Sequence, residues 1–95
     1  TEYTTEQLDL FRTTGKDFFK TASQYTAEAI ANNNFDIKTL ADLLKTKFNL
    51  SGKKLFMPLR LSLSMTDHGP ELANLVALMG IKKVKERFDQ VINLI

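Results

Sequence analysis

The chain has 95 residues, 43% of them hydrophobic, which is enough for one small domain with its own core and too few for two. It contains no cysteine and one histidine, which excludes a disulfide framework and the usual cysteine-based metal sites. The net charge of +2 is unevenly distributed, because residues 1–36 carry three basic and six acidic side chains and residues 37–95 carry ten basic and five acidic ones. A basic C-terminal part suits a polyanionic partner, although charge alone fits a solvated lysine face equally well.

Features that the sequence lacks indicate where the protein is located and whether the chain is part of a larger protein. No apolar run approaches the length of a membrane span, and the N-terminus lacks the basic-then-apolar layout of a signal peptide. We therefore expect a cytoplasmic protein with no membrane contact. The chain begins at Thr1 without methionine, which suits a fragment, so we expect residues 1–95 to be a single domain of a larger protein.

The first half of the chain is predicted to form three helices. A short first helix begins after Thr4 or Thr5, either of which can cap it. Over residues 16–32, aromatic, alanine and isoleucine side chains recur every three or four positions, which predicts an amphipathic helix. Asp36 is well placed to cap a third helix over residues 37–48.

A fourth helix is predicted over residues 53–64, in the part of the chain that also holds both prolines and the only histidine. Ser51 can cap this helix, and Pro58 in its interior predicts a bend. At about 100° per residue, the helix has two sides of different character. The side expected to pack carries Leu55, Phe56, Leu59 and Leu63, and the side expected to be free carries Lys53, Met57, Arg60 and Ser64.

A loop and a fifth helix are predicted to follow. Residues 65–69 show no hydrophobic period, and Pro70 has the preset φ of a first helical residue, so a helix is predicted from Pro70 to Met79. The first turn of this helix leaves backbone N–H groups without partners beside the face that bears Arg60. Such a place suits an acceptor-rich ligand.

The last helix is predicted over residues 81–94, after Gly80 in the position of a left-handed cap. No segment shows the sustained alternation of a strand, and no internal repeat is visible. The fold is therefore predicted to be all-α, a small multi-helix bundle of five or six helices.

Three short motifs, taken in order, resemble one known family. They are Leu55-Phe56-Met57-Pro58-Leu59-Arg60, then His68-Gly69-Pro70-Glu71-Leu72, then Leu78-Met79-Gly80-Ile81-Lys82-Lys83-Val84 with Arg87 one turn further on. Together they resemble the C-terminal anticodon-binding region of bacterial-type glutamyl-tRNA synthetases. The resemblance covers residues 35–95 well and the first third only weakly, and it departs at Ser64-Met65, where the family commonly has threonine-glycine.

This resemblance implies the distal anticodon-binding domain of a glutamate–tRNA ligase, with the all-α fold of the class I anticodon-binding type. The implied partners are the anticodon stem-loop of tRNA-Glu and the rest of a synthetase chain that we expect to be a monomer. The class activates its amino acid with ATP through a histidine-glycine-histidine signature and a lysine-rich loop, and neither occurs here. ATP and magnesium would thus belong to a catalytic part outside this chain, which itself would hold no catalytic residue, cofactor or metal.

The resemblance also implies which residues contact RNA. Those expected against the anticodon bases are Met57, Arg60, Gly69, Pro70 and Leu72. An arginine plane can stack on an unpaired base and hydrogen-bond its edge, whereas a methionine meets a base only through apolar surface. Further contacts, with the RNA backbone, are expected from Lys53, Lys54, Ser64, His68, Lys82, Lys83 and Lys85. The alternative roles are helix packing for Leu72 and turn formation for His68.

Two other classes of binding protein also fit the pattern. The last two predicted helices, joined at Gly80, superficially resemble a helix-turn-helix that would present Lys82 and Lys83 to DNA. A helical protein-interaction domain would instead expose a contiguous apolar patch. Catalysis has little support, because Asp67 beside His68 is more often a solvated pair than part of a catalytic triad.

Overall fold

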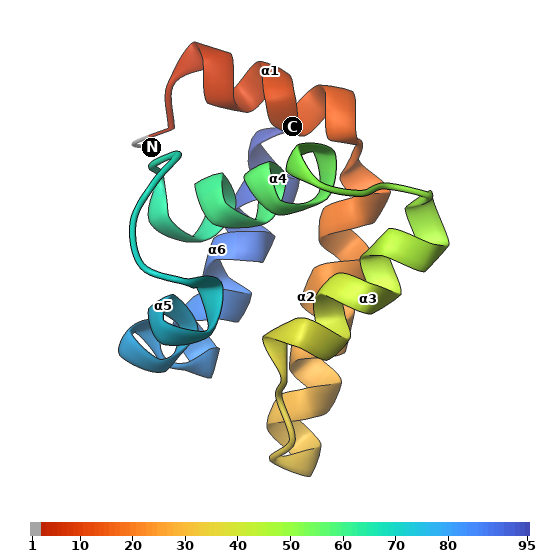
Figure 1. Ribbon diagram of the computed structural model, residues 1–95, viewed down its shortest axis with the longest axis vertical. Coiled ribbons are helices and arrows are strands. Elements are labelled where there is room, and N and C mark those ends of the chain that lie inside the picture. The colour runs from red at the N-terminus through yellow and green to blue at the C-terminus, as the bar shows by residue number, and fades with distance from the viewer. Residues whose placement is uncertain (1–2) are drawn as a thin grey trace.

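The computed structural model describes residues 3–95, and these residues form six α-helices with short connections (Figure 1). The helices are α1 (Thr5–Thr14), α2 (Lys16–Asn32), α3 (Ile37–Phe48), α4 (Lys53–Ser64), α5 (Leu72–Met79) and α6 (Ile81–Leu94). The described part of the chain contains no strand, so the prediction of an all-α bundle is confirmed. Within the same residues, no helix combines the length and the apolar character that crossing a membrane requires.

Local side-chain hydrogen bonds explain where several helices begin and end. The Thr4 hydroxyl accepts a hydrogen bond from the Gln7 N–H at 3.1 Å, and the Gln7 side chain accepts one from the Thr4 N–H at 3.0 Å, which forms a capping box for α1. Asp36 caps α3 with its carboxylate. Asn33 and Asn49, with φ of 52° and 54°, end α2 and α3 in the left-handed conformation that asparagine tolerates. The capping roles predicted for Thr4 and Asp36 are confirmed.

The centre of the bundle is the pair α2 and α6, which share the largest helix–helix contact. In Figure 1, α1 lies across one end of the bundle and α5 lies beside the first turns of α6 at the other end. The side chains with no exposed surface include Phe11, Phe18, Phe19, Leu40, Leu44, Leu59, Val84, Phe88 and Val91. Full burial of each such side chain contributes about 1.5–3 kcal/mol, so this core stabilises the arrangement of the remaining helices.

Helix α1 and the residue Tyr3 before it fix the position of the end of α4 and of the segment that follows it. The Tyr3 hydroxyl donates a hydrogen bond to the Ser62 carbonyl oxygen in α4. The side-chain amide of Gln7 donates one to the Met65 carbonyl oxygen at 2.9 Å. The N-terminal part of the chain, which carries the weakest family resemblance, thus holds the end of α4 and the loop after it.

The structure corrects two predictions about α4. Gly52, rather than Ser51, is the residue at the N-cap, and it makes no side-chain hydrogen bond there. Phe56 was predicted to pack, and it is 46% exposed. The reason is that α4 also buries Pro58 and Leu61, so its packed face is centred farther from Phe56 than the leucines alone indicated.

The structure also corrects the predicted start of α5. The helix begins at Leu72 instead of Pro70, and its first backbone hydrogen bond runs from the Leu75 N–H to the Glu71 carbonyl at 2.9 Å. Glu71 has a ψ of 149°, which is extended and not helical, so the helix starts after it, and the Pro70 carbonyl accepts a hydrogen bond from Arg60. At the other end of α5, Gly80 has the predicted positive φ of 84°, but its ψ of 147° lies outside the left-handed helical region.

Candidate nucleic-acid interface

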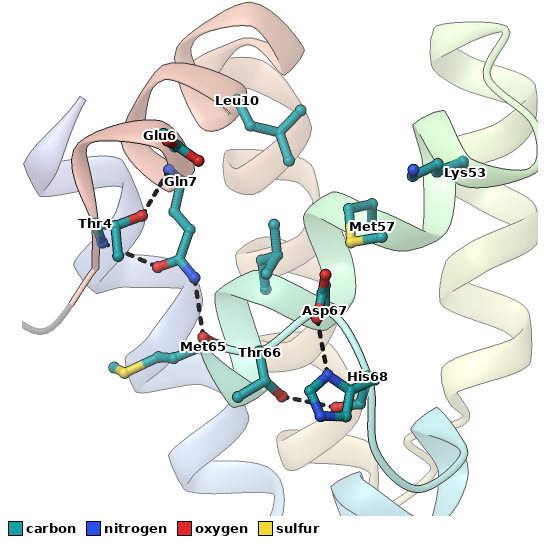
Figure 2. Close-up of a pocket in the computed structure, with 11 residues that line it drawn as sticks. Thr4, Glu6, Gln7, Leu10, Lys53, Met57, Met65, Thr66, Asp67 and His68 are labelled. Atoms are coloured by element: carbon teal, nitrogen blue, oxygen red, sulfur yellow. Dashed lines mark hydrogen bonds and ion pairs between the residues drawn. The ribbon is translucent and has the colours of Figure 1, made fainter.

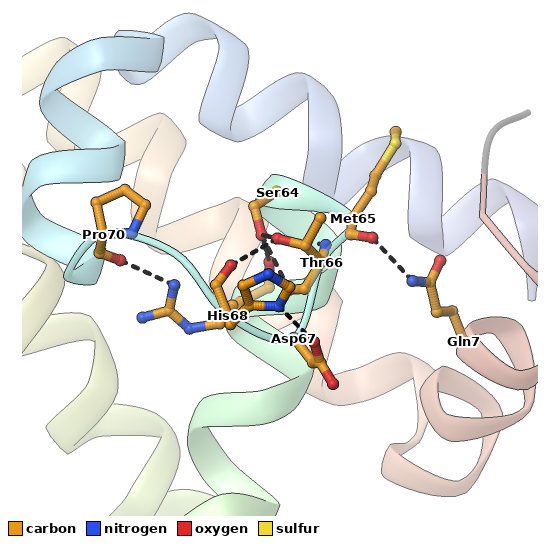
Figure 3. A network of polar contacts seen from close by, with 8 residues as sticks. Gln7, Ser64, Met65, Thr66, Asp67, His68 and Pro70 are labelled. Carbon is orange, nitrogen blue, oxygen red and sulfur yellow. Dashed lines mark hydrogen bonds and ion pairs between the residues drawn. The ribbon is translucent and has the colours of Figure 1, made fainter.

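Arg60 joins α4 to the start of α5. Its guanidinium Nη1 donates a hydrogen bond to the Pro70 carbonyl oxygen at 2.8 Å (Figure 3). Within residues 3–95, no carboxylate forms an ion pair with Arg60. The side chain is half-buried, so the site holds an oriented guanidinium whose charge no acid neutralises and whose other N–H groups remain available for acceptors.

Gly69 occupies a backbone conformation that only glycine adopts easily. Its φ of 140° lies in the region that side chains disfavour, so glycine is favoured here. A Cβ at this position would lie 3.7 Å from Nη1 of Arg60, which is ordinary contact distance. The preference for glycine therefore comes from backbone strain, and the absent side chain also leaves the surface beside the guanidinium open.

Hydroxyl groups shape the loop between α4 and α5. The Ser64 hydroxyl donates to the Arg60 carbonyl at 2.8 Å and accepts from the Thr66 N–H at 3.3 Å. The Thr66 hydroxyl donates to the His68 carbonyl at 2.7 Å (Figure 3). Ser64 therefore has a structural partner on each side, which accounts for this residue without an RNA contact.

His68 is paired with the preceding acid on the surface of this loop. Its Nδ1 lies 2.8 Å from a carboxylate oxygen of Asp67, and both side chains are largely exposed. The hydrogen bond with His68 is the main cause that lowers the pKa of Asp67 below its ordinary value. The position of His68 at the exposed loop agrees with either of its predicted roles, as RNA contact or as turn residue.

Pro70 and Leu72 lie on either side of the helix start. Pro70 is exposed, whereas Leu72 is half-buried against the core. Glu71 precedes the first turn of α5 without a side-chain cap, so the first N–H groups of this helix have no side-chain acceptor. The predicted unpartnered N–H groups are thus present, two residues later than expected, next to the carbonyl that binds Arg60.

A pocket of about 580 Å³ lies between α1, α4 and the loop after α4. Figure 2 shows Thr4 and Gln7 on one side of it, Lys53 and Met57 on the other, and the loop with His68 between them. The remaining lining residues are Glu6, Leu10, Leu61, Met65, Thr66 and Asp67. Three of the predicted contact residues, Lys53, Met57 and His68, therefore share one concave surface, which also carries two carboxylates.

The α6 lysines that were predicted to contact RNA differ in whether they are already paired with an acid. Lys85 donates to the Asp89 carboxylate at 2.7 Å, and Lys83 forms an ion pair with Glu86 at 3.7 Å. Lys82 is exposed. Of the three α6 lysines predicted to contact the RNA backbone, two are therefore already paired with acids of the same helix.

Comparison with known proteins shows the family of this chain. The family model described as "Anticodon binding domain" matches residues 2–92. The chain belongs to this family. This anticodon-binding domain is similar to a glutamate–tRNA ligase 2 of Coxiella burnetii, with 37% identity over 86 residues that cover 90% of the chain and 18% of that protein.

Two further relatives are also glutamate–tRNA ligases. The glutamate–tRNA ligase 2 of Caldanaerobacter subterraneus is 28% identical over 102 residues, which cover 99% of the domain and 20% of that protein. The glutamate–tRNA ligase 1 of Brucella ovis is 46% identical over 50 residues, which cover 53% of the domain and 11% of that protein. The domain thus spans about a fifth or less of the length of these relatives. No solved structure gives a significant match.

The family confirms the resemblance that the three motifs carry, and it does not favour a helix-turn-helix protein. In the anticodon-binding domain, Val84 and Phe88 of α6 are wholly buried, and Lys83 is paired with Glu86. The face that a recognition helix would offer to DNA thus has few unpaired cations.

The contribution of α1 to this surface was missed by sequence reasoning. Thr4, Glu6, Gln7 and Leu10 line the pocket of the anticodon-binding domain, and Gln7 bonds to a loop residue 58 positions later. The local pattern of α1 shows only a capped helix with one apolar side. No local signal connects α1 with a loop so distant in sequence. Only the folded structure shows that α1 lines one side of the pocket.

Proposed function

We propose that this domain binds the anticodon stem-loop of tRNA-Glu and reads its unpaired bases. The observation that supports it is the Arg60 guanidinium, which has no acidic partner within residues 3–95 and is oriented by Pro70 beside an exposed loop. An arginine plane can stack on a splayed base and bond its edge, which is how single-stranded RNA is recognised in sequence-specific complexes. Gly69, Pro70 and the first turn of α5 add backbone and apolar surface to the same place.

We further propose that the domain works within a glutamate–tRNA ligase. The names of its relatives and the short part of their length that it covers support this proposal. Amino-acid activation with ATP and magnesium then belongs to the rest of the ligase, and this domain contributes binding and no chemistry. The ligase is proposed to be a monomeric, cytoplasmic enzyme.

An NMR titration with a tRNA-Glu anticodon stem-loop tests the interface. We expect amide shifts to cluster at Met57, Arg60 and residues 69–72, because Gly69 and Pro70 lie next to the guanidinium and Met57 precedes Arg60 by about one helical turn. A duplex DNA of equal length at the same salt concentration is the control, and it should not shift these residues. Equal shifts of the surface lysines with both nucleic acids would reduce the domain to a nonspecific cationic surface.

Two substitutions of Arg60 distinguish recognition of a base from simple electrostatic attraction to RNA. Arg60→Ala should weaken binding by about 1–3 kcal/mol and reduce binding of the cognate anticodon more than that of other anticodons. Arg60→Lys keeps the charge and loses the planar fork, so it should retain nonspecific binding and lose the preference for the cognate loop. If Arg60→Lys binds the cognate stem-loop like the wild type, Arg60 supplies only charge.

A further inference from the structure

Among the phenylalanines and tyrosines within residues 3–95, Phe56 is the one whose side chain is exposed. Its exposed fraction is 46%, and it is absent from the core and from the hydrophobic residues packed against the core. The other phenylalanines and both tyrosines in this part of the chain are buried or half-buried. Exposing a ring of this size forgoes the burial energy that the other aromatics contribute, and it leaves part of the ring surface accessible to a ligand.

The neighbours of Phe56 on α4 are cationic. Arg60 lies one turn after it, about 40° around the helix and about 6 Å along its axis, which makes the two side chains neighbours on one face. Lys53 lies one turn before it and is exposed. Helix α4 contains no aspartate or glutamate. The three side chains Lys53, Phe56 and Arg60 therefore form a strip in which an aromatic ring lies between two positive charges.

We propose that Phe56 is a stacking platform for an unpaired base of the RNA loop, next to the nucleotide that Arg60 contacts. This inference rests on the proposed function. Proteins that hold single-stranded nucleic acid place aromatic rings under the bases and cations along the phosphates, and the strip has both. Phe56 has no hydrogen-bonding group, so it contributes affinity for any base, while Arg60 reads the base edge.

The chemistry of the strip favours RNA over a protein partner. The centre of a protein–protein interface is depleted in lysine, whereas here Lys53 lies one turn from the ring and Lys54 two residues from it, both exposed. Helix α5 itself carries no charged side chain, and its Leu78 is 80% exposed beside Ala77. Leu78 therefore provides the control position for an exposed apolar side chain on a helix without cations.

Affinity measurements on the 95-residue chain test the platform first. Phe56→Leu keeps an apolar side chain and removes the ring, and Phe56→Ala removes both. We expect about tenfold weaker binding of the anticodon stem-loop for each, because stacking of one base on an aromatic ring is worth that much or more. The salt dependence should not change, since no charge is removed. Leu78→Ala should bind like the wild type.

A fluorescence measurement then tests direct contact. The chain has no tryptophan, so Phe56→Trp introduces a single indole at the proposed platform. Stacking of a base on this indole should quench its emission when the stem-loop is added. Leu78→Trp places an equally unique indole on α5, and its emission should stay constant in the same titration.

The outcomes distinguish failure of this inference from failure of the proposed function. If Arg60→Ala weakens RNA binding while Phe56→Leu and Phe56→Ala bind like the wild type, the platform is overturned and the anticodon-binding function stands. If the wild-type chain does not bind the stem-loop at all, both are overturned. Weaker binding by both Phe56 variants, together with quenching only for Phe56→Trp, supports the platform.

Discussion

Met65 adopts a backbone conformation that a side chain disfavours. It ends α4 with φ of 64°, in the left-handed region that costs a residue other than glycine about 1–2 kcal/mol. Its thioether lies 3.6 Å from a guanidinium nitrogen of Arg87, and its carbonyl accepts the bond from Gln7. The side chain is thus used in packing, while its backbone is strained.

The cost of this conformation can be isolated by comparing two variants. Met65→Gly and Met65→Ala both remove the thioether, so the packing that they lose is nearly the same. We expect Met65→Gly to be more stable than Met65→Ala by about 1 kcal/mol, because glycine adopts a positive φ without strain. Urea denaturation followed by circular dichroism measures the difference. Equal stabilities would mean that residue 65 leaves the left-handed region in the variants.

At the residue scale, sequence reasoning singled out Arg60 and Gly69 as contact residues, which stays a prediction, and it misplaced Phe56. The first two belong to motifs whose residue types are themselves informative, namely an arginine on a mainly apolar helix and a glycine before a proline. Phe56 lies at the border of the apolar stripe of α4. Its exposure depends on which side of α4 packs against the other helices, and the pattern of α4 alone does not contain that information.

Helices α2 and α6 are joined by a polar contact at the edge of the core. The Asp89 carboxylate of α6 accepts hydrogen bonds from the Ser23 hydroxyl of α2 and, at 2.7 Å, from the Lys85 ammonium. Partial burial by itself would raise the pKa of Asp89, but the hydrogen bonds from Lys85 and Ser23 outweigh it and lower this pKa. The charged form of Asp89 is therefore stabilised by folding.

The stabilisation by Asp89 should depend on pH. A carboxyl group with a lowered pKa in the folded state stabilises above its unfolded pKa, about 3.9, and loses this effect as the pH falls through the folded value. We expect Asp89→Asn to lower the free energy of unfolding by about 1 kcal/mol at pH 7, given its partial exposure. The difference from the wild type should shrink below about pH 4.

Denaturation curves from pH 7 down to pH 3 measure this effect. Asp42→Asn, on an exposed residue of α3 for which no ion pair occurs among the described residues, is the control for loss of one negative charge. A difference between Asp89→Asn and the wild type that stays constant across this range would show that the ionised carboxylate does not stabilise the α2–α6 contact.

At the element scale, the helices were largely predictable because their signals are local. Thr4 and Asp36 are caps in both the sequence prediction and the structure, and the apolar stripes repeat with the helical period. The start of α5 was predicted two residues early. Pro70 has the dihedral preference of a first helical residue, but Glu71 after it is extended, with a ψ of 149°, and the Pro70 carbonyl is hydrogen-bonded to Arg60, a tertiary contact that a sequence pattern does not record.

The arrangement of the helices in the whole molecule was beyond sequence reasoning. The largest contact joins α2 to α6, and the contact of Gln7 with Met65 joins the first helix to the loop after α4. These partners lie far apart in the chain, and an amphipathic stripe shows only that a helix packs, without its partner. Because of this arrangement, residues of α1 line the same pocket as Met57.

The pairing of charges in the folded molecule changes the prediction made from net charge. Residues 37–95 carry ten basic side chains, but Lys83 is paired with Glu86 at 3.7 Å and Lys85 with Asp89 at 2.7 Å. Lys54, at the start of α4, is exposed and has no ion pair among the described residues. The cations available to RNA phosphates should therefore be concentrated at α4 more than at α6.

The salt dependence of RNA binding tests this distribution. For single-stranded RNA, each neutralised phosphate contributes about 0.7 to the slope of log K against log salt concentration. Lys54→Gln should therefore reduce the slope by about 0.7, whereas Lys83→Gln, which removes the same charge from a lysine already paired with Glu86, should change it much less. Fluorescence anisotropy with a labelled anticodon stem-loop at four or more potassium chloride concentrations gives the slopes. Equal reductions for the two variants would mean that the RNA covers α6 as well as α4 and displaces the carboxylate from Lys83.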